Sequence, residues 1–492
     1  MSPSHASSTH GLRRWPILVA VAVVLLGAGV WDHHQGAPAV PGAPADLTSA
    51  VPPTGAESSS WYCAGGSGTT GGSANAQIQI ADAGAQPVSG TVTVVNQLGA
   101  TASGTFSVPA GQVGVVDPAA IEPGTWVAAS LVADGGAVAV SQSVSGATGW
   151  AQAPCASATA TSWYFASGST AAGTDAYLSL FNPTTTTAVA DLTFLTDAGP
   201  TQPAPFQGLV IGPGQLVVED LGTYVQAQQD VATTVEVRSG RLVAAQLEVA
   251  TGTAQGLSLQ PGSPSPSDHW AFPATTDVSG ATTTFAITNP TSSPEPVTVR
   301  VELPSGPVAP FTQTLAPDSA WQLTTSGASR IPVGVAYALQ VTSSGGPGVV
   351  VARSVSWPTA LASPRSGSVA GVPAADEAAN GVRTWLLPPP GTASSPAVAG
   401  AAPLDVGLVN TGTTDVTVRV SSLNGAVATA LAGDEAVLLH PGQAFDVGYS
   451  ALQATAADTL EVSSSGPLAV MEDLVPSGMA GVVSQAGMPV LP

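Results

Sequence analysis

The chain contains the same sequence pattern four times, and this internal repeat restricts its fold more than any other feature. Each copy opens on a tryptophan within a short apolar segment, as in Trp163-Tyr-Phe-Ala-Ser-Gly. The four opening tryptophans are Trp61, Trp163, Trp270 and Trp385. They lie 102, 107 and 115 residues apart, a spacing that matches the length of a sandwich domain and exceeds that of a solenoid repeat.

Downstream of each tryptophan, two segments alternate apolar and polar side chains with a period of two, which predicts β-strands. Asn182, Asn289 and Asn410 lie between these segments in copies two, three and four. A side-chain amide at this place can cap the backbone of a turn. We therefore expect a β-hairpin in every copy, over residues 76–95, 176–195, 283–303 and 404–423.

Two further landmarks follow in the same order in each copy. The first is a tight turn such as Ile211-Gly-Pro-Gly-Gln-Leu, where Pro presets the turn and Gly or Asp tolerates the corner. The second is a pair of apolar strands around a Gly-rich turn, for which we expect another hairpin. With a Gly-led closing tail, each copy supplies about seven short strands.

The predicted fold is all-β, with four tandem immunoglobulin-like antiparallel β-sandwich repeats after an N-terminal transmembrane or signal segment. Residues 374–382 hold at most one helical turn in a linker. The pattern leaves open whether the repeats are independent or interlocked. The predicted repeats span residues 59–158, 159–263, 264–374 and 382–492.

An apolar run over residues 17–30 follows Arg13 and Arg14, and this arrangement is typical of a membrane-targeting segment. We predict a cytoplasmic n-region at 1–14, a signal anchor or signal peptide at 15–31 and a Pro/Ala-rich spacer at 32–58. The chain is then a single-pass protein of the cell membrane with its C-terminal part outside the cytoplasm. Cleavage and secretion is the alternative.

The two cysteines lie in the first and last segments of copy one. Cys63 is two residues after Trp61, where copy two has the apolar Phe165, so this position is expected to face inward. Cys155 lies in the tail that closes the copy. We infer one disulfide between them, since the predicted location outside the cytoplasm permits it.

Charge and histidine content argue against several functional classes. The net charge is −21, which disfavours binding to nucleic acid. Only His269 and His440 lie in the repeats, and neither is matched in another copy, so we expect no metal and no cofactor. Carboxylates near predicted turns leave a hydrolase as the least favoured reading. They are Asp117, Glu219, Asp220, Asp376, Glu377, Glu472 and Asp473.

The tryptophans offer a second functional reading. The four opening tryptophans recur at one repeat position, which favours a role in the core. Trp150 and Trp357 are not matched across copies and are the candidates for exposed stacking on a glycan.

The motif SWYFASGSTAAGTDAYLSLFNP of copy two, with the later Pro-x-Gly turn, resembles a repeat of actinobacterial cell-surface proteins. The resemblance covers residues 60–492 and points to the uncharacterised family called domain of unknown function 5719. It implies an exported or anchored envelope protein and brings no catalytic residues with it.

These observations together predict a non-catalytic, extracytoplasmic cell-envelope protein that acts as a structural scaffold or surface interaction module. The alternative is a carbohydrate-binding accessory protein of the cell wall. Its partners are then the membrane, through the N-terminal segment, and a cell-wall glycan or an envelope protein.

Overall fold

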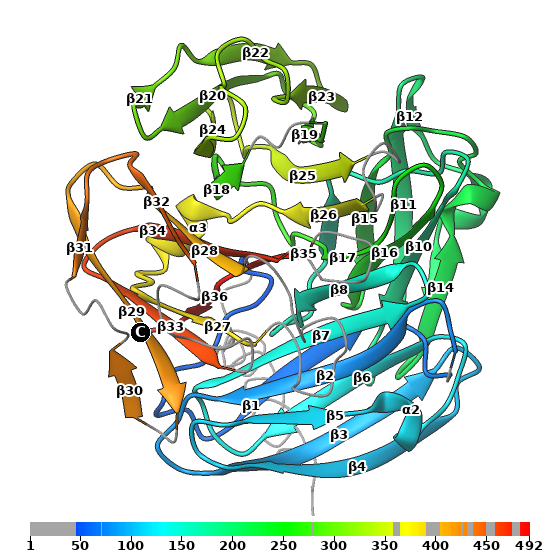
Figure 1. The fold of residues 1–492 in the computed structure, drawn as a ribbon. Coiled ribbons are helices and arrows are strands. Elements are labelled where there is room, and N and C mark those ends of the chain that lie inside the picture. The colour runs from blue at the N-terminus through cyan, green and yellow to red at the C-terminus, as the bar shows by residue number, and fades with distance from the viewer. Residues whose placement is uncertain are drawn as a thin grey trace, which may run out of the picture. The chain divides into compact units, whose positions relative to one another are not determined.

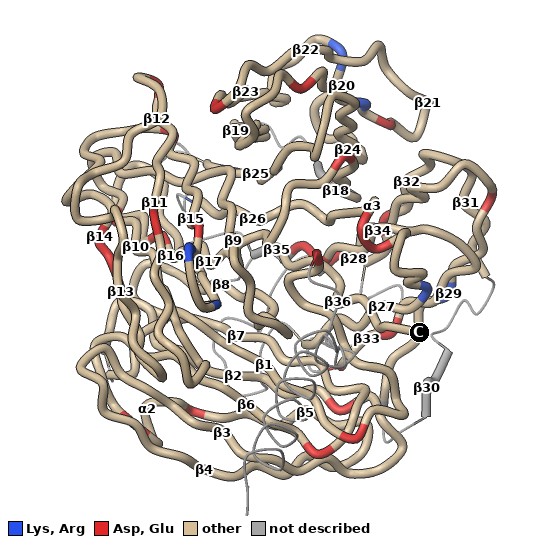
Figure 2. Tube along the Cα trace, turned by 180° about the vertical axis from the view of Figure 1, so that it is seen from behind, with Lys and Arg blue, Asp and Glu red and all other residues tan. Residues whose placement is uncertain are grey.

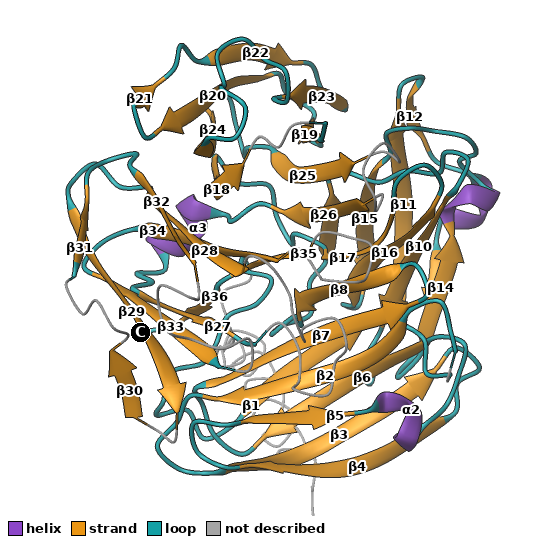
Figure 3. Cartoon of the chain, viewed as in Figure 1, coloured by secondary structure: helices purple, strands orange, loops and turns teal. Residues whose placement is uncertain are grey.

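Each of the four copies forms two antiparallel β-sheets around an apolar core (Figures 1 and 3). We call each copy a module. Its opening sheet holds the strand with the opening tryptophan, and its closing sheet holds the last strand before the next module. The structure is a computed structural model that describes residues 46–492 except 70, 277–279, 358–364, 390–403, 425–426, 431–435, 449–457 and 475–482.

The predicted all-β class is confirmed. Within the described residues, α-helix is limited to α2 (Pro118–Ile121) and α3 (Ala374–Ala379), and 3-10 helix to η1 (Ala204–Phe206) and η2 (Leu221–Thr223). The predicted n-region, the targeting segment and most of the spacer lie outside the described residues. Among the helices that are described, none has the length and apolar character needed to cross a membrane.

Modules 1 and 2 have matching sheet orders. In module 1 the opening sheet runs β1 (Ser59–Ala64), β6 (Val127–Ala133), β3 (Val88–Asn96), β4 (Thr101–Val108), and the closing sheet runs β5 (Val113–Val116), β2 (Asn75–Asp82), β7 (Val138–Gly146), β8 (Gly149–Pro154). In module 2 the opening sheet runs β9 (Ser162–Phe165), β15 (Ala232–Ser239), β11 (Ala188–Thr196), β12 (Gly199–Thr201), with β13 (Leu209–Ile211) also on β11. Its closing sheet runs β14 (Leu216–Asp220), β10 (Thr174–Phe181), β16 (Val243–Thr251), β17 (Gln255–Pro261).

Modules 3 and 4 repeat this order. The opening sheet of module 3 runs β18 (His269–Thr276), β24 (Ala336–Ser343), β20 (Glu295–Leu303), β21 (Gly306–Pro307), with β22 (Phe311–Leu315) also on β20. Its closing sheet runs β23 (Ser319–Thr324), β19 (Thr282–Asn289), β25 (Val350–Trp357), β26 (Arg365–Ala370). The opening sheet of module 4 runs β36 (Met488–Val490), β27 (Thr384–Leu387), β33 (Thr459–Ser464), β29 (Val416–Asn424), β30 (Val427–Ala430), with β31 (Val437–Leu439) also on β29. Its closing sheet runs β32 (Ala444–Gly448), β28 (Leu404–Asn410), β34 (Leu468–Leu474), β35 (Val483–Ala486).

The expected hairpins are wrong in every module. In module 1, β2 pairs with β5 and β7, whereas β3 pairs with β4 and β6, so the chain crosses from one sheet to the other between them. The later pair is also split, because β6 belongs to the opening sheet and β7 to the closing sheet. A period of two shows only that one face of a strand is buried, and therefore does not distinguish a hairpin from a crossing between sheets.

The three predicted asparagines are buried at these crossings, where each one caps the turn. The Nδ2 group of Asn182 donates to the carbonyls of Thr186 (2.7 Å) and Ile211 (3.0 Å), and its Oδ1 accepts from the amide of Thr184 (3.0 Å). Asn289 and Asn410 make the corresponding contacts. The amide therefore ties the crossing to the strand before the Pro-containing turn.

All four opening tryptophans are buried in the modules that they open. The indole Nε1 of Trp163 donates to the carbonyl of Leu242 (2.9 Å), and that of Trp270 to the carbonyl of Val349 (2.7 Å). In module 4 the carboxyl group of Glu377 replaces this carbonyl and accepts a hydrogen bond from Nε1 of Trp385 (2.9 Å). Burial of a large ring in the core explains why the residue recurs. Its polar atom is satisfied in modules 2, 3 and 4, whereas the buried Nε1 of Trp61 has no hydrogen-bond partner among the described residues.

The disulfide between Cys63 and Cys155 is present, as predicted. In modules 2 and 3 the positions equivalent to Cys155 are glycines, and an aromatic ring fills the space instead of sulfur. A Cβ at Gly262 would lie 2.9 Å from Cζ of Phe165, and one at Gly371 would lie 2.8 Å from Cζ of Phe272. The crosslink thus replaces a ring-on-glycine contact at the same place in the fold.

The closing strands of the four modules meet in a common centre (Figure 1). β8 packs beside β17 and β35, and β26 packs beside the same two strands, so the contacts run from module 1 around to module 4 and back. Apolar cores continue across the junctions; Trp150 of module 1, for example, lies in the core of module 4. The modules are therefore interlocked.

Residues 47–51 join this centre, and we call them the latch. Val51 forms an isolated parallel β-bridge with Val490 of β36, so segments near the beginning and the end of the described chain lie side by side. Thr48 Oγ1 donates to the carbonyl of Gly262 (2.9 Å), and Ser49 Oγ to that of Cys155 (2.7 Å). The latch thus connects modules 1, 2 and 4.

Candidate functional site

Two of the hollows between described residues of different modules differ greatly in size, and closing sheets build both of them. The central cavity lies among the four closing strands and the latch, and has a volume of about 60 Å³. The intermodule groove lies between modules 2 and 3, and has a volume of about 550 Å³. Small-molecule sites usually measure about 300–1,000 Å³, so only the groove has the size of a ligand site.

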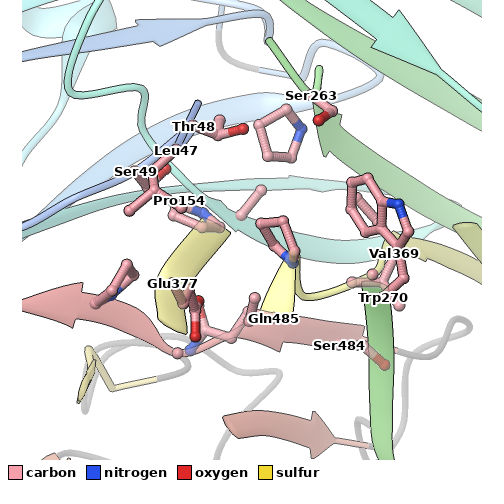
Figure 4. A pocket seen from close by; sticks show the side chains of 18 of the residues that line it. Leu47, Thr48, Ser49, Pro154, Ser263, Trp270, Val369, Glu377, Ser484 and Gln485 are labelled. Carbon is pink, nitrogen blue, oxygen red and sulfur yellow. The ribbon is translucent and has the colours of Figure 1, made fainter. Parts of the chain in front are cut away.

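The central cavity is lined by residues of every module (Figure 4). Its polar side chains include Glu377 of α3 and Gln485 of β35. Burial raises the pKa of Glu377 to about 8, against the lowering effect of the hydrogen bond from Trp385. The carboxyl group of Glu377 is therefore mainly neutral at pH 7. In so small a cavity it serves packing and hydrogen bonding rather than ligand binding.

The module 2 wall of the groove comes from one face of β16 and β17 and from two turns. Glu248, Ala250, Gly256 and Ser258 lie on this face. The alternate residues on the same strands turn to module 1, where they form a sealed apolar cluster with Ala151 and Ala153; they are Leu247, Val249, Leu257 and Leu259. One pair of strands thus presents an apolar face to module 1 and a small, polar face to module 3.

The module 3 wall is a grid of hydroxyl groups, which we call the hydroxyl grid. One row crosses all four strands of the closing sheet in register, through Thr324, Thr284, Ser354 and Ser368. A second row crosses β19, β25 and β26 through Thr282, Ser356 and Ser366. Neighbouring strands are about 4.8 Å apart, so the seven hydroxyls form a regular polar surface.

Carboxyl groups lie along the groove. Glu248 accepts a hydrogen bond from the amide of Ser169 (2.6 Å), and burial raises its pKa to about 7. Asp230 and Gln322 line both the groove and an adjoining hollow of about 280 Å³, which also holds Asp197 and Asp318. Burial, with the nearby charge of Asp197, raises the pKa of Asp230. No arginine lines the described walls of either hollow.

Asp318 stands at a backbone position where the other modules have glycine. Its φ is +47°, close to the +65° of Gly214 at the equivalent turn of module 2. A side chain in this left-handed region costs conformational energy, and such positions concentrate at functional sites. Module 3 thus places a carboxylate at the end of the groove at the expense of local strain.

The carboxylates selected from the sequence lie on elements of modules 1, 2 and 4 and on α3. Asp117 and Asp220 cap the short helices α2 and η2, and Glu219 lies on β14. Asp376 lies beside Glu377 on α3. Glu472 accepts from Gln485 (2.6 Å), and Asp473 accepts from the buried Arg353 of module 3 (2.7 Å). The contact of Asp473 joins modules 3 and 4, whereas that of Glu472 lies within module 4.

The histidines have local partners. His269 Nε2 lies 2.9 Å from Oε1 of Gln340, and burial lowers its pKa. His440 Nδ1 lies 2.9 Å from the carboxylate of Asp415 at the surface. In the described part of the chain, no group of three His, Cys, Asp or Glu residues could hold a metal ion.

The two tryptophans selected for glycan stacking do not have the exposure that this role needs. Trp150 is 2% exposed and Trp357 is 8% exposed, so neither ring presents a face to solvent. The tryptophan of β8 turns inward to the core of module 4 instead. For Trp150, the failure to match across copies therefore reflects packing at the junction between modules 1 and 4.

Sequence reasoning missed the groove residues. A signal was present, because Thr282, Thr284, Ser354, Ser356, Ser366 and Ser368 are alternating hydroxyls on three strands. Each strand alone looks like an ordinary strand with a polar face. Only the pairing register shows that the three polar faces form one surface.

Residues 133–380 match the Family of unknown function (DUF5719), and the chain belongs to this family. The match includes both walls of the groove. Among curated proteins nothing matches.

Three solved structures show weak likenesses to this chain. A crystal structure of Thermotoga maritima 1070 is 16% identical over 22% of this chain and 94% of its own, with a TM-score of 0.20. The Anabaena sensory rhodopsin transducer is 18% identical over 18% of this chain and 92% of its own, with a TM-score of 0.16. A tetra-tandem repeat from the extending region of a large adhesion protein is 12% identical over 87% of this chain and 94% of its own, with a TM-score of 0.12. Likenesses at this level carry no argument about function.

Proposed function

We propose that the chain is a non-catalytic interaction scaffold of the cell envelope, built from tandem immunoglobulin-like sandwiches and held outside the membrane by its N-terminal segment. The observation that carries the proposal is the interlocked centre, where four closing strands and the latch join all modules. A fold that fixes four modules in one arrangement suits a protein whose task is to hold surfaces in place.

The charge and the disulfide support the same location. Acidic residues lie on all four modules, while arginines are few (Figure 2). This surface disfavours nucleic acid as a partner. The Cys63–Cys155 disulfide suits an oxidising compartment, since such bonds are rare in the cytosol.

Cell fractionation tests this proposal in cells that make the protein. We expect the full chain in the envelope fraction, open to added protease in intact cells, with both cysteines oxidised. Incubation with envelope polysaccharide should release no new reducing ends. A cytosolic protein with two reactive thiols, or one that releases sugar, would contradict the proposal.

A second candidate function is carbohydrate binding as a cell-wall accessory protein. The observation that favours it is the intermodule groove with its hydroxyl grid. A hydrolase stays the least favoured reading, because it needs a placed pair of carboxylates flanking the bond to be cut.

A further inference from the structure

The four module junctions use equivalent positions in different ways. Within each closing sheet, one cross-strand pair faces the preceding module: Leu247 with Leu259 in module 2, Ser354 with Ser368 in module 3, Asp473 with Ser484 in module 4 and Ser143 with Gln152 in module 1. The backbone arrangement at these pairs is shared. Their side chains therefore decide whether a junction is sealed or open.

Three of the junctions close over this pair. Leu247 and Leu259 form a sealed apolar cluster with module 1. Asp473 and Ser484 both accept hydrogen bonds from Arg353 of module 3. Gln152 of module 1 donates to the carbonyl of Pro389 of module 4 (3.1 Å).

The junction between modules 2 and 3 closes only at its inner end, where Ser368 contacts Ser258 and Gln260. Further out, Ser354, Ser356 and Ser366 line the groove. At the equivalent places module 2 has Leu247, Val249 and Leu257, and apolar side chains there would have sealed this junction too. Module 3 thus has small hydroxyl side chains where module 2 has larger apolar ones, and a volume of about 550 Å³ is left between modules 2 and 3.

The chemistry of the walls selects the ligand. A hydroxyl both donates and accepts hydrogen bonds, so a grid of them complements a chain that is itself rich in hydroxyls. Among the described residues that line the groove, Asp230 and Glu248 are the acidic ones, and in their ionised forms they repel an acidic ligand. A peptide would need pockets for apolar side chains or an open strand edge, and the grid is a polar sheet face.

We propose that the intermodule groove binds a polysaccharide that carries no acidic groups, along the hydroxyl grid. This inference rests on the proposed envelope location and names the ligand class for its carbohydrate-binding form. The adjoining hollow with Asp197, Asp230 and Asp318 extends the site at one end. An amine on the sugar chain would gain a favourable charge interaction there.

Affinity electrophoresis of the full chain tests the proposal in gels that contain a polysaccharide. The neutral probes are dextran, laminarin and galactomannan; chitosan oligosaccharide is the amine-bearing probe and alginate the acidic one. We expect retardation by at least one neutral probe and none by alginate. Retardation by alginate alone, or by no probe, would overturn the groove proposal, while cell fractionation decides the envelope proposal separately.

Variants then locate the binding site. Thr284→Val with Ser354→Ala removes two neighbouring hydroxyls of the grid, and we expect at least a tenfold weaker Kd. The matched control is Thr93→Val with Ser103→Ala, an exposed cross-strand hydroxyl pair of module 1 whose oxygens lie 2.9 Å apart. Equal binding by the two variants would overturn the proposal.

A second grid variant guards against misfolding of the first. Ser356→Ala with Ser366→Ala changes the other row by two oxygen atoms only. Circular dichroism and the thermal midpoint should match those of the wild type. A folded variant of this row with unweakened binding would also count against the proposal.

Discussion

Removal of the Cys63–Cys155 crosslink should destabilise module 1 and leave module 2 almost unchanged. The crosslink joins residues 92 apart in the sequence. Closing a loop of that length in the unfolded chain corresponds to about 4.6 kcal/mol at 25 °C by the chain-entropy relation. The perturbation is Cys63→Ala with Cys155→Ala, compared with the oxidised wild type.

The native backbone around the crosslink should survive its removal. Tyr62 and Ala156 exchange both of their backbone hydrogen bonds, at 2.8 and 2.9 Å, directly beside the two sulfurs. Module 2 has the same backbone contact between Tyr164 and Ser263, without a disulfide. The lost free energy therefore belongs mainly to the unfolded state of module 1.

Amide hydrogen exchange with mass spectrometry reads this effect module by module. The expected loss in the free energy of unfolding corresponds to amide exchange that is faster by about three orders of magnitude. This acceleration should be seen in peptides of β1 and β8 whose amides exchange only when module 1 unfolds. Peptides of β9 and β17 serve as the internal control. The reduced wild type keeps both sulfur atoms, and so separates the crosslink from the packing of its side chains.

Two outcomes would refute this reasoning. Equal exchange of β1 and β8 in the oxidised and reduced proteins would mean that the sealed junctions already hold module 1 closed. An equal acceleration in all four modules would mean that the chain opens as one unit, so that no loop of module 1 is released separately.

Three more predictions concern single side chains. Because burial raises the pKa of Glu377 to about 8, the folded protein retains a proton that the unfolded chain releases, and its free energy of unfolding should fall as the pH rises from about 4.5 to 8. The variant Glu377→Gln still accepts a hydrogen bond from Trp385 and should flatten this decline, which thermal unfolding at pH 5 and 8 measures. Asn289→Ala leaves buried carbonyls without their donor and should lower the free energy of unfolding by about 1–3 kcal/mol in urea titrations. Gly371→Ala places a Cβ 2.8 Å from the ring of Phe272 and should cost about 1–3 kcal/mol, a loss that the additional change Phe272→Leu should reduce in a double-mutant cycle.

Features held by local chemistry could be predicted from the sequence. The capping role of Asn182 follows from its place between two alternating segments, and the structure confirms that it caps a turn. The turn glycines follow in the same way, since Gly214 has a φ of +65° and Gly442 one of +76°. These features depend on a few residues that are neighbours in the sequence, and a repeated sequence pattern shows directly which neighbouring residues recur.

Features set by partners distant in the chain could not be predicted in this way. A strand such as β2 shows one buried face whether its successor pairs with it or crosses to the other sheet, so the hairpins were wrong. The sequence does not predict the latch, for the same reason. Val51 lies in a Pro-rich segment without periodicity, and only its pairing with Val490 shows that it belongs to the fold.

The repeat itself explains why the four recurring tryptophans are buried and why the serines of the groove were overlooked. A residue that recurs in all four modules, such as Trp270, maintains the common fold and is buried for that purpose. A binding site in a repeat protein is better sought where one module departs from its neighbours at a position that the fold leaves free. Ser356 and Ser366 occupy such positions, because module 2 has Val249 and Leu257 there and seals its junction with them. The contrast between equivalent pairs, rather than their similarity, is the part of the repeat that carries information about function.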